Sequence, residues 1–517
     1  MSAHAASTLR KTVVIDIVAL TQDLITNENT PFLASYLYPS GRFPATTVAD
    51  IQPAFPAVTC TAQTTYLTGT GPSEHGILGN NTFDREFGER ISELAPKRQP
   101  RPCPRLFERV KRADPNATTF SSFWWFPMGD RFIDYALTPR PQYLANNGKV
   151  ADIWTKPEHL RHSLQRELGT FPLHDFWGPT ASIASSKWIV DSTICVDKMY
   201  DPTFSVIYLP HLDYALQHTS TDHTHPTIAK DLKEIDAEVR RLVHYYEHHP
   251  ANPRVIILSE YGIQPVTRPV HINRNGGETL DPYASIAFAI PDHQVAHVYV
   301  NDQSSFPPKS GNVVGGPAAR VSADHARVVS HVQAVLEAVP GVKSVLRGRD
   351  SADVDRHYDP TGRWRVSDHD AGSRARVGDL VVVADHDAWF TYYYWERESN
   401  APDFAYTVNI HRKPGYDPVE MYHAYPLLGK IYLLLKVVLV YLLHFRGIID
   451  NTRFDADRIR GSHGATHDLP RRYWPVLGTR SPELVEHALG RKVDTGAGSI
   501  VRAEDVAGII WAHLTRE

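Results

Sequence analysis

Residues 58–80 read VTCTAQTTYLTGTGPSEHGILGN, and this stretch decides the fold. It follows the extended segment QPAFPAV at 52–58, and residues 59–67 are predicted to form a helix that ends before the turn GPSEHGI. Thr59 stands at the N-terminus of this helix, where a hydroxyl can cap an unpaired backbone N–H. The helix dipole also makes this position favourable for an anionic nucleophile and a bound phosphate. Thr59 is therefore either a helix cap or a nucleophile.

Three apolar stretches on either side of this helix are predicted strands that carry a carboxylate at their ends. They are VVIDIV at 13–18 with Asp16, PTFSVIYLPHLD at 202–213 with Asp213, and PRVIILSEYGI at 253–263 with Glu260. A helix is predicted over 228–248, between the last two strands. Strands that alternate with helices indicate an α/β fold with a mainly parallel sheet, whose ligands gather at the carboxyl edge.

The composition excludes several classes of protein. Among 517 residues, 54 Lys and Arg stand against 58 Asp and Glu, so no basic excess predicts a nucleic-acid polymer as partner. Three scattered cysteines do not make a disulfide framework, and no apolar leader precedes the first predicted strand. These features favour a cytoplasmic location.

The middle of the chain differs from both ends. Residues 264–374 are rich in Gly, Pro and Asn and in short alternating strands, which predicts a smaller inserted α+β lobe. The core would then comprise residues 1–263 and 375–517, because a buried-strand pattern resumes in VGDLVVVAD at 377–385. Residues 301–316 are predicted to be a surface loop, and the acidic and histidine residues of DHQVAHVYV (292–300) are expected to be structural.

The segment IYLLLKVVLVYLL at 431–443 is the most apolar of the chain. Thirteen residues are too few to cross a bilayer, which takes about 20. A buried helix is expected, and docking on a membrane surface is the less favoured alternative.

The chain resembles the alkaline phosphatase superfamily, and is most similar to its nucleotide pyrophosphatase/phosphodiesterase and phosphonoacetate hydrolase branch. The resemblance rests on VVIDIV and on the Thr-headed helix that runs into LTGTGPSEHGILGN. It continues through VIYLPHLDYALQH, VIILSEYGI, RVGDLVVVAD and RIRGSHG. It implies an alkaline-phosphatase-like three-layer sandwich and a Thr or Ser nucleophile between two divalent ions, with a covalent phospho-enzyme.

Several residues match the family pattern directly. Asp16 falls on a metal ligand and Thr59 on the nucleophile, itself a metal ligand. Asn80 falls on the residue that holds a phosphoryl oxygen, and the backbone N–H of Cys60 would complete that oxyanion site. His463, between glycines in RGSHG, falls on a histidine ligand.

Other positions depart from the pattern. Asp213 matches the first residue of an Asp-x-x-x-His pair, but the fourth position is Gln217 and His218 comes one residue late, so it can be a ligand only outside a regular helix. Glu260 and Tyr261 stand where the family usually has Asp-His. Glu260 is expected to bind metal, whereas Tyr261 is expected to bond a ligating carboxylate or the phosphoryl group.

His411 in NIHRKPGYDPVEM is a further candidate. It can be a metal ligand, a neighbour of the phosphate or a structural residue, and the sequence leaves these alternatives open.

We expect a metal-dependent hydrolase of small phosphoesters, of the phosphodiesterase or pyrophosphatase type. The alternatives are a phosphonate hydrolase or phosphotransferase on the same scaffold, and a catalytically silent metal-binding scaffold protein. Two divalent ions are expected, with zinc favoured by the resemblance and manganese by the oxygen-rich ligand set.

Overall fold

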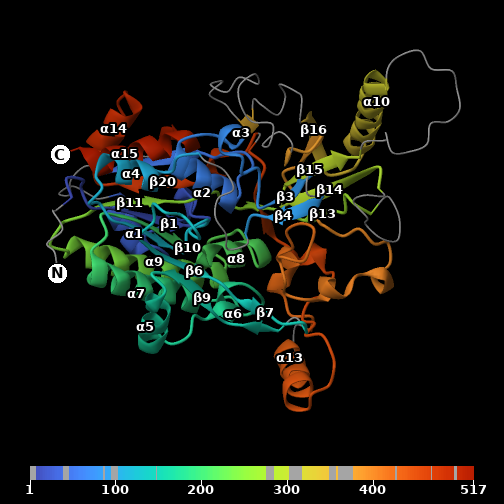
Figure 1. Ribbon diagram of the computed structural model, residues 1–517, viewed down its shortest axis with the longest axis horizontal. Helices are drawn as coiled ribbons and strands as arrows, with labels where there is room; N and C mark the ends of the chain where they lie inside the picture. The colour runs from blue at the N-terminus through green and yellow to red at the C-terminus, as the bar shows by residue number, and fades with distance from the viewer. Residues whose placement is uncertain are drawn as a thin grey trace, which may run out of the picture.

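The computed structural model describes residues 7–516, except 39–45, 86–87, 95–102, 147, 275–284, 302–316, 349–356, 359–375, 426–427, 467 and 494–497. Most of the loop predicted at 301–316 therefore lies outside the described residues. The described chain forms a large α/β core and a smaller lobe beside it (Figure 1).

The core is built on one nine-stranded sheet of mainly parallel strands. Its order is β21-β2-β20-β11-β1-β10-β5-β6-β9. These strands are β1 (Thr12–Ile17), β2 (Thr47–Gln52), β5 (Thr119–Ser122), β6 (Tyr135–Pro139), β9 (Ile153–Lys156), β10 (Phe204–Leu209), β11 (Arg254–Leu258), β20 (Val476–Thr479) and β21 (Ser499–Arg502). The three central strands β11, β1 and β10 are parallel to one another, as the sequence predicts.

Helices cover both faces of this sheet and make a three-layer sandwich (Figure 1). One face carries α2 (Thr59–Thr68), α4 (Leu106–Ala113), α14 (Pro482–Leu489) and α15 (Val506–Thr515). The other carries α1 (Pro31–Leu37), α5 (His159–Leu168), α7 (Ile183–Tyr200), α8 (His211–His218) and α9 (Pro226–Glu247). The predicted fold class is confirmed.

Helix α9 illustrates how the sequence selects these elements. Pro226 occupies its first turn, where a missing N–H costs nothing. Ile228, Leu232, Ile235 and Val239 are buried at helical spacing against the sheet.

The smaller lobe leaves and rejoins the core at one place, because β12 (Gln264–Pro265) pairs with β19 (Gly461–Ser462). Its four-stranded sheet has the order β14-β15-β17-β16, formed by β14 (Ala287–Asp292), β15 (Val295–Val300), β17 (Leu380–Ala384) and β16 (Val342–Arg347). Helix α10 (Pro317–Glu337) packs on it.

The expectation that the core sheet resumes at 377–385 is wrong. Strand β17 is buried on both faces, like a central core strand, but it pairs with β15 and β16 of the small sheet. Burial alone does not tell a strand of one sheet from a strand of another. Among the described residues, the next strand that joins the main sheet is β20.

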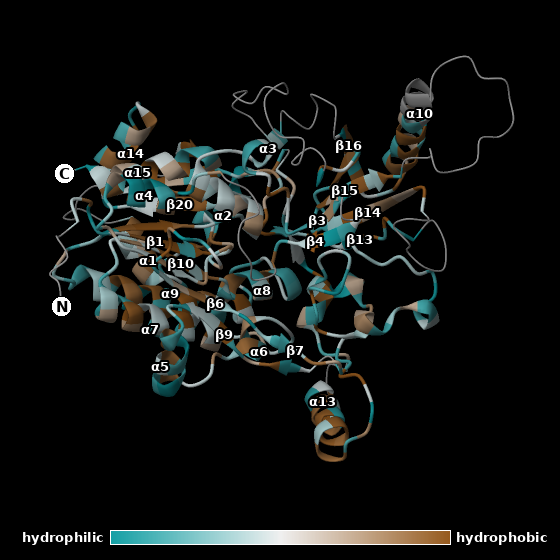
Figure 2. Cartoon of the chain, in the orientation of Figure 1, coloured by the Kyte–Doolittle hydropathy of each residue, from teal (hydrophilic) through white to brown (hydrophobic). Residues whose placement is uncertain are grey.

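The apolar segment at 431–443 forms α13 (Gly429–Val437), continued by a π-helical turn over Val438–Leu442. It projects away from both the core and the lobe (Figure 2). Ile431, Leu434 and Leu442 are 57%, 63% and 70% exposed, so the expectation of a buried helix is wrong. Within the described residues, no helix has the length and apolar character needed to cross a membrane.

Candidate active site

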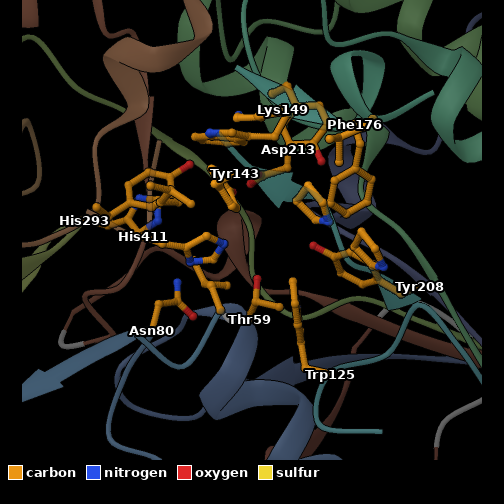
Figure 3. A pocket seen from close by; sticks show the side chains of 18 of the residues that line it. Thr59, Asn80, Trp125, Tyr143, Lys149, Phe176, Tyr208, Asp213, His293 and His411 are labelled. Atoms are coloured by element: carbon orange, nitrogen blue, oxygen red, sulfur yellow. The ribbon is translucent and has the colours of Figure 1, made fainter. Parts of the chain in front are cut away.

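The site lies where the central strands end. Asp16 stands near the end of β1, Glu260 follows β11 by two residues, and Asp213 lies in the first turn of α8, directly after β10. Thr59 is the first residue of α2, and its side chain points toward the same space (Figure 3). Val58 is the N-cap residue and Thr59 the first residue of the helix, and the Thr59 hydroxyl contacts the Tyr261 hydroxyl instead of capping the helix.

Asp16 and Glu260 form a buried acidic pair. Both are fully buried, and within the described residues neither oxygen of Asp16 nor Oε2 of Glu260 has a hydrogen-bond partner. The Gln63 amide donates to Glu260 Oε1 at 2.6 Å. Burial, and then repulsion from Glu260, raises the pKa of Asp16, and burial likewise raises that of Glu260. Two such acids with unsatisfied oxygens make a place that a cation would stabilise.

Asp213, by contrast, accepts two side-chain hydrogen bonds. The Gln217 amide donates to its Oδ2 at 2.8 Å, and the Tyr261 hydroxyl donates to its Oδ1 at 3.2 Å. Burial raises the pKa of Asp213 to about 7. The Tyr261 hydroxyl also lies 3.2 Å from Thr59 Oγ1, so it bridges the threonine and the aspartate.

His463 faces Asp213 across a longer gap, with Nε2 at 3.9 Å from Oδ1. Its Nδ1 lies 2.7 Å from the Ala57 carbonyl, which fixes the proton on that nitrogen and leaves Nε2 as an acceptor. Burial lowers the pKa of His463 to about 3. The neighbouring Gly461 is required here, because a Cβ would lie 2.2 Å from the Leu216 carbonyl oxygen.

Four buried rings stack into a column through the site, which we call the ring column. Tyr261 stacks on His463 with centroids 3.6 Å apart, His463 packs on His293 at 3.7 Å, and His293 stacks on Tyr416 at 3.7 Å. The Tyr416 hydroxyl in turn donates to the side-chain oxygen Oε1 of Gln217 at 3.2 Å. Tyr261 comes from the core, and His293 and Tyr416 come from the lobe.

Asn80 lies beside Thr59, as the resemblance implies. Its Oδ1 accepts the Cys60 N–H at 3.1 Å, and its backbone N–H donates to Asp292 Oδ2 at 2.6 Å. The Cys60 N–H thus points to Asn80 itself in this structure, and the Asn80 amide nitrogen is 3.4 Å from Asp292 Oδ1. The Cys60 side chain packs among Ile77, Trp125 and Phe126.

Two predicted candidates are not brought into the acidic pair. Helix α8 is regular through residue 218, so Gln217 faces Asp213 while His218 turns away, with its Nδ1 at 2.7 Å from Thr219 Oγ1 and its ring against Tyr422. The prediction of His218 as a ligand fails on this geometry. His411 lines the pocket near Asn80, with its ring edge-on to Tyr143.

An aromatic pocket opens beside Thr59 (Figure 3). Its wall includes Trp125, Tyr143, Phe176, Trp177, Tyr208, Tyr214 and Tyr416. Lys149 is the one lysine or arginine among the described residues that line it, and burial lowers its pKa.

The pocket wall is braced from behind by a buried ion cluster. Lys413 Nζ lies 2.6 Å from Asp417 and 2.8 Å from Glu420, and all three side chains are buried. Glu420 also accepts the Trp177 indole N–H at 2.7 Å.

Sequence reasoning missed Gln63, Asp292, His293 and Tyr416. Asp292 and His293 stand in the stretch that was expected to be structural, and only their contacts across the lobe boundary reveal their place. Gln63 carried a signal, since it lies one helical turn after Thr59.

The fold and this site define a class, the phosphoester hydrolases. The sequence model of type I phosphodiesterase/nucleotide pyrophosphatase matches residues 12–417, and the chain belongs to that family. Enzymes of this family are metal-dependent.

One curated protein and two solved structures are similar to this chain. Ectonucleotide pyrophosphatase/phosphodiesterase 1 of Saccharomyces cerevisiae is 23% identical over 269 residues, which is 50% of this chain and about a third (35%) of that protein's length. The fold is similar to murine ectonucleotide pyrophosphatase/phosphodiesterase 5, solved as an inactive variant with AMP (12% identity, TM-score 0.54, 96% and 93% of the two chains). It is also similar to phosphonoacetate hydrolase from Sinorhizobium meliloti, solved with phosphonoacetate (13%, 0.52, 98% and 95%).

Proposed function

We propose that the chain is a phosphodiesterase in which Thr59 is the nucleophile and a single divalent ion assists it. The observation that carries this proposal is the hydrogen-bonded line from Thr59 through Tyr261 to Asp213. It lies beside an acidic pair in which both oxygens of Asp16 and Oε2 of Glu260 lack a hydrogen-bond partner among the described residues. The line supplies a base for the nucleophile, and the pair supplies a place for the ion.

The direction of the line follows from counting protons. Tyr261 has one hydroxyl proton, and it donates that proton to Asp213. Thr59 must then donate to Tyr261 across their 3.2 Å contact. As Thr59 attacks, its proton passes to Tyr261 while the Tyr261 proton passes to Asp213, so the charge ends on the nucleophile and Asp213 becomes neutral.

Asp16, Glu260 and the Thr59 hydroxyl would hold the ion. A divalent cation held there would neutralise the acidic pair, polarise a phosphoryl oxygen and lower the pKa of the threonine hydroxyl. An all-oxygen set favours Mn²⁺ or Mg²⁺ over Zn²⁺, which prefers nitrogen and sulfur ligands.

One ion, rather than the pair the resemblance implies, is supported by what surrounds Asp213. Gln217 and Tyr261 stand where two histidine ligands are expected, and both donate to this carboxylate. Tyr261 thus takes over charge stabilisation at Asp213 that a second cation would otherwise provide.

In the proposed reaction, a Thr59 Oγ1–phosphorus bond forms as the bond from phosphorus to the leaving oxygen breaks. Water then adds its hydroxide to phosphorus and its proton to the Thr59 oxygen, which restores the threonine, and the proton on Asp213 passes through solvent to the departed oxygen anion, which restores the carboxylate. The N-terminus of α2 would face the anionic phosphoryl group, and Asn80, held in place by Asp292, would lie beside that group.

The pocket favours a diester with an aromatic substituent. Its aromatic wall suits a ring, and a single lysine suits one negative charge better than the two of a monoester. Nucleotide diesters have this chemistry, and a nucleotide is the ligand bound by the murine neighbour.

Thr59→Ala and Thr59→Ser test the nucleophile, with bis(p-nitrophenyl) phosphate as substrate. We expect Thr59→Ala to lose nearly all turnover at unchanged melting temperature, and Thr59→Ser to retain measurable turnover and trap a phosphoserine. An alanine variant as active as wild type refutes the assignment.

Two measurements separate the alternatives. Phosphonoacetate in place of the diester, with product analysis, tests the phosphonate hydrolase. Metal analysis distinguishes one ion, two ions and none; bound metal without turnover on any of these substrates would favour the silent scaffold.

A further inference from the structure

Most of the large apolar side chains that are exposed in the described residues gather in one place. They come from residues 425–445 and from the hairpin of β7 (Gln142–Tyr143) and β8 (Lys149–Val150). We call this set the apolar spur; its most exposed members are Leu428, Ile431, Leu434, Leu435, Leu442, Leu443 and Phe445, at 55–70%. Contiguous exposed apolar surface of this kind marks a site of interaction.

We propose that the apolar spur docks the protein on the surface of a lipid bilayer that contains anionic lipids. A bilayer, rather than a protein groove, fits the distribution of the side chains. Exposed and half-exposed apolar residues surround the helix. Leu433, Val437 and Val440 lie on the sides of the helix that do not carry the seven most exposed residues. A groove would cover one face of a helix, whereas lipid can cover a projecting end on every side.

The charge of this segment supports the same partner. The chain carries a net −4, yet no Asp or Glu occurs from residue 424 to 449. Lys430, His444 and Arg446 are exposed at the two ends of the apolar run, and Lys436 pairs with Asp450. Cations that flank apolar side chains are the arrangement that anionic headgroups attract.

The length of the helix decides how it lies. Residues 429–442 span about 21 Å at 1.5 Å per residue, short of a hydrocarbon core of about 30 Å. The spur therefore inserts into the interface of one leaflet and does not cross.

The spur is joined to the rim of the aromatic pocket. The Ile449 N–H donates to the Asn146 carbonyl oxygen at 2.9 Å. The Tyr441 hydroxyl packs directly on Gly148, where a side chain would not fit, because a Cβ added there would lie 1.8 Å from the hydroxyl oxygen. The neighbouring Tyr143 and Lys149 line the pocket. Docking would bring the pocket to the membrane surface, so its substrates would include amphiphilic phosphodiesters held there; this last step rests on the proposed function.

The test is sedimentation of the full chain with vesicles of phosphatidylcholine, with and without phosphatidylglycerol. We expect wild type to bind the anionic vesicles more strongly, and binding to weaken with salt. Leu434→Ser/Leu442→Ser should reduce partitioning by about tenfold or more, because two side chains leave the acyl region. The matched control Met199→Ser/Val335→Ser also removes two exposed apolar side chains, far from the spur in sequence, and should bind like wild type.

Turnover of a soluble substrate distinguishes the docking proposal from the proposed phosphodiesterase function. The leucine variant should hydrolyse bis(p-nitrophenyl) phosphate like wild type, since neither leucine lines the pocket. If wild type binds vesicles but does not hydrolyse the substrate, the proposed function is refuted and the docking proposal stands. Absence of vesicle binding by wild type overturns the docking, and so does a dimer that the leucine variant dissociates, because the spur would then meet a second copy of the chain.

Discussion

Replacing Tyr261 by Phe removes one oxygen atom from the centre of the proposed mechanism. That oxygen lies 3.2 Å from both Thr59 Oγ1 and Asp213 Oδ1, so the variant separates the nucleophile from its base. General-base catalysis is worth about 10²–10⁴ in rate, which corresponds to about 3–5 kcal/mol in the barrier.

The cost to stability is smaller. The Phe ring can keep its place on His463, where the Tyr261 ring stacks at 3.6 Å, and the loss is that of two long hydrogen bonds, about 1–3 kcal/mol. The metal should stay, since Asp16 and Glu260 are untouched.

The assay is turnover of bis(p-nitrophenyl) phosphate together with bound metal and thermal unfolding. Tyr416→Phe is the matched control, because it removes a buried hydroxyl from the other end of the ring column without touching Thr59. We expect Tyr261→Phe to lose about 10²-fold or more in kcat, and Tyr416→Phe far less. Turnover of Tyr261→Phe within threefold (about 0.7 kcal/mol) of wild type, or loss of its metal, would refute the reasoning.

Three further predictions concern other parts of the structure. Glu260→Gln keeps the size of the side chain but removes its charge, so bound metal should fall and turnover should drop by about 10²-fold or more, measured by elemental analysis and kinetics. Lys413→Met leaves Asp417 and Glu420 buried without their cation and should cost about 3–5 kcal/mol in urea unfolding; an unchanged midpoint would contradict the cluster's role. Burial lowers the pKa of His513 to about 4 against an ordinary 6.5, so the unfolded state takes up the proton first as the pH falls. The contribution of this residue to the free energy of unfolding should be full above pH 6.5 and decline toward pH 4 by about 3 kcal/mol. His513→Gln should flatten that decline.

The sequence predicts those parts of the site that local patterns determine. Asp16, Asp213 and Glu260 meet because parallel strands bring their carboxyl ends to one edge. The position of Thr59 follows from the helix that is predicted to begin at this residue. The regular helix α8 brings Gln217, four residues after Asp213, to this carboxylate and turns His218 away from it.

What the sequence does not predict depends on contacts between distant segments. His293 and Tyr416 join the site only because the lobe packs against the core, and no local pattern encodes that packing. The strand at 380–384 has the same apolar pattern in either sheet. The run at 431–443 indicates apolar surface that needs cover, but the pattern does not say whether protein or lipid provides it.

The ring column also restricts how the protein can be recombined. Its members come from two parts of the chain: Tyr261 and His463 flank the lobe at its two junctions, and His293 and Tyr416 lie within it. A lobe transplanted from a relative would arrive without the partners of these rings, and the tyrosine beside the nucleophile would lose its support. The lobe is thus not an interchangeable cap, and chimaeras in this family should work only when the junction residues are exchanged together with it.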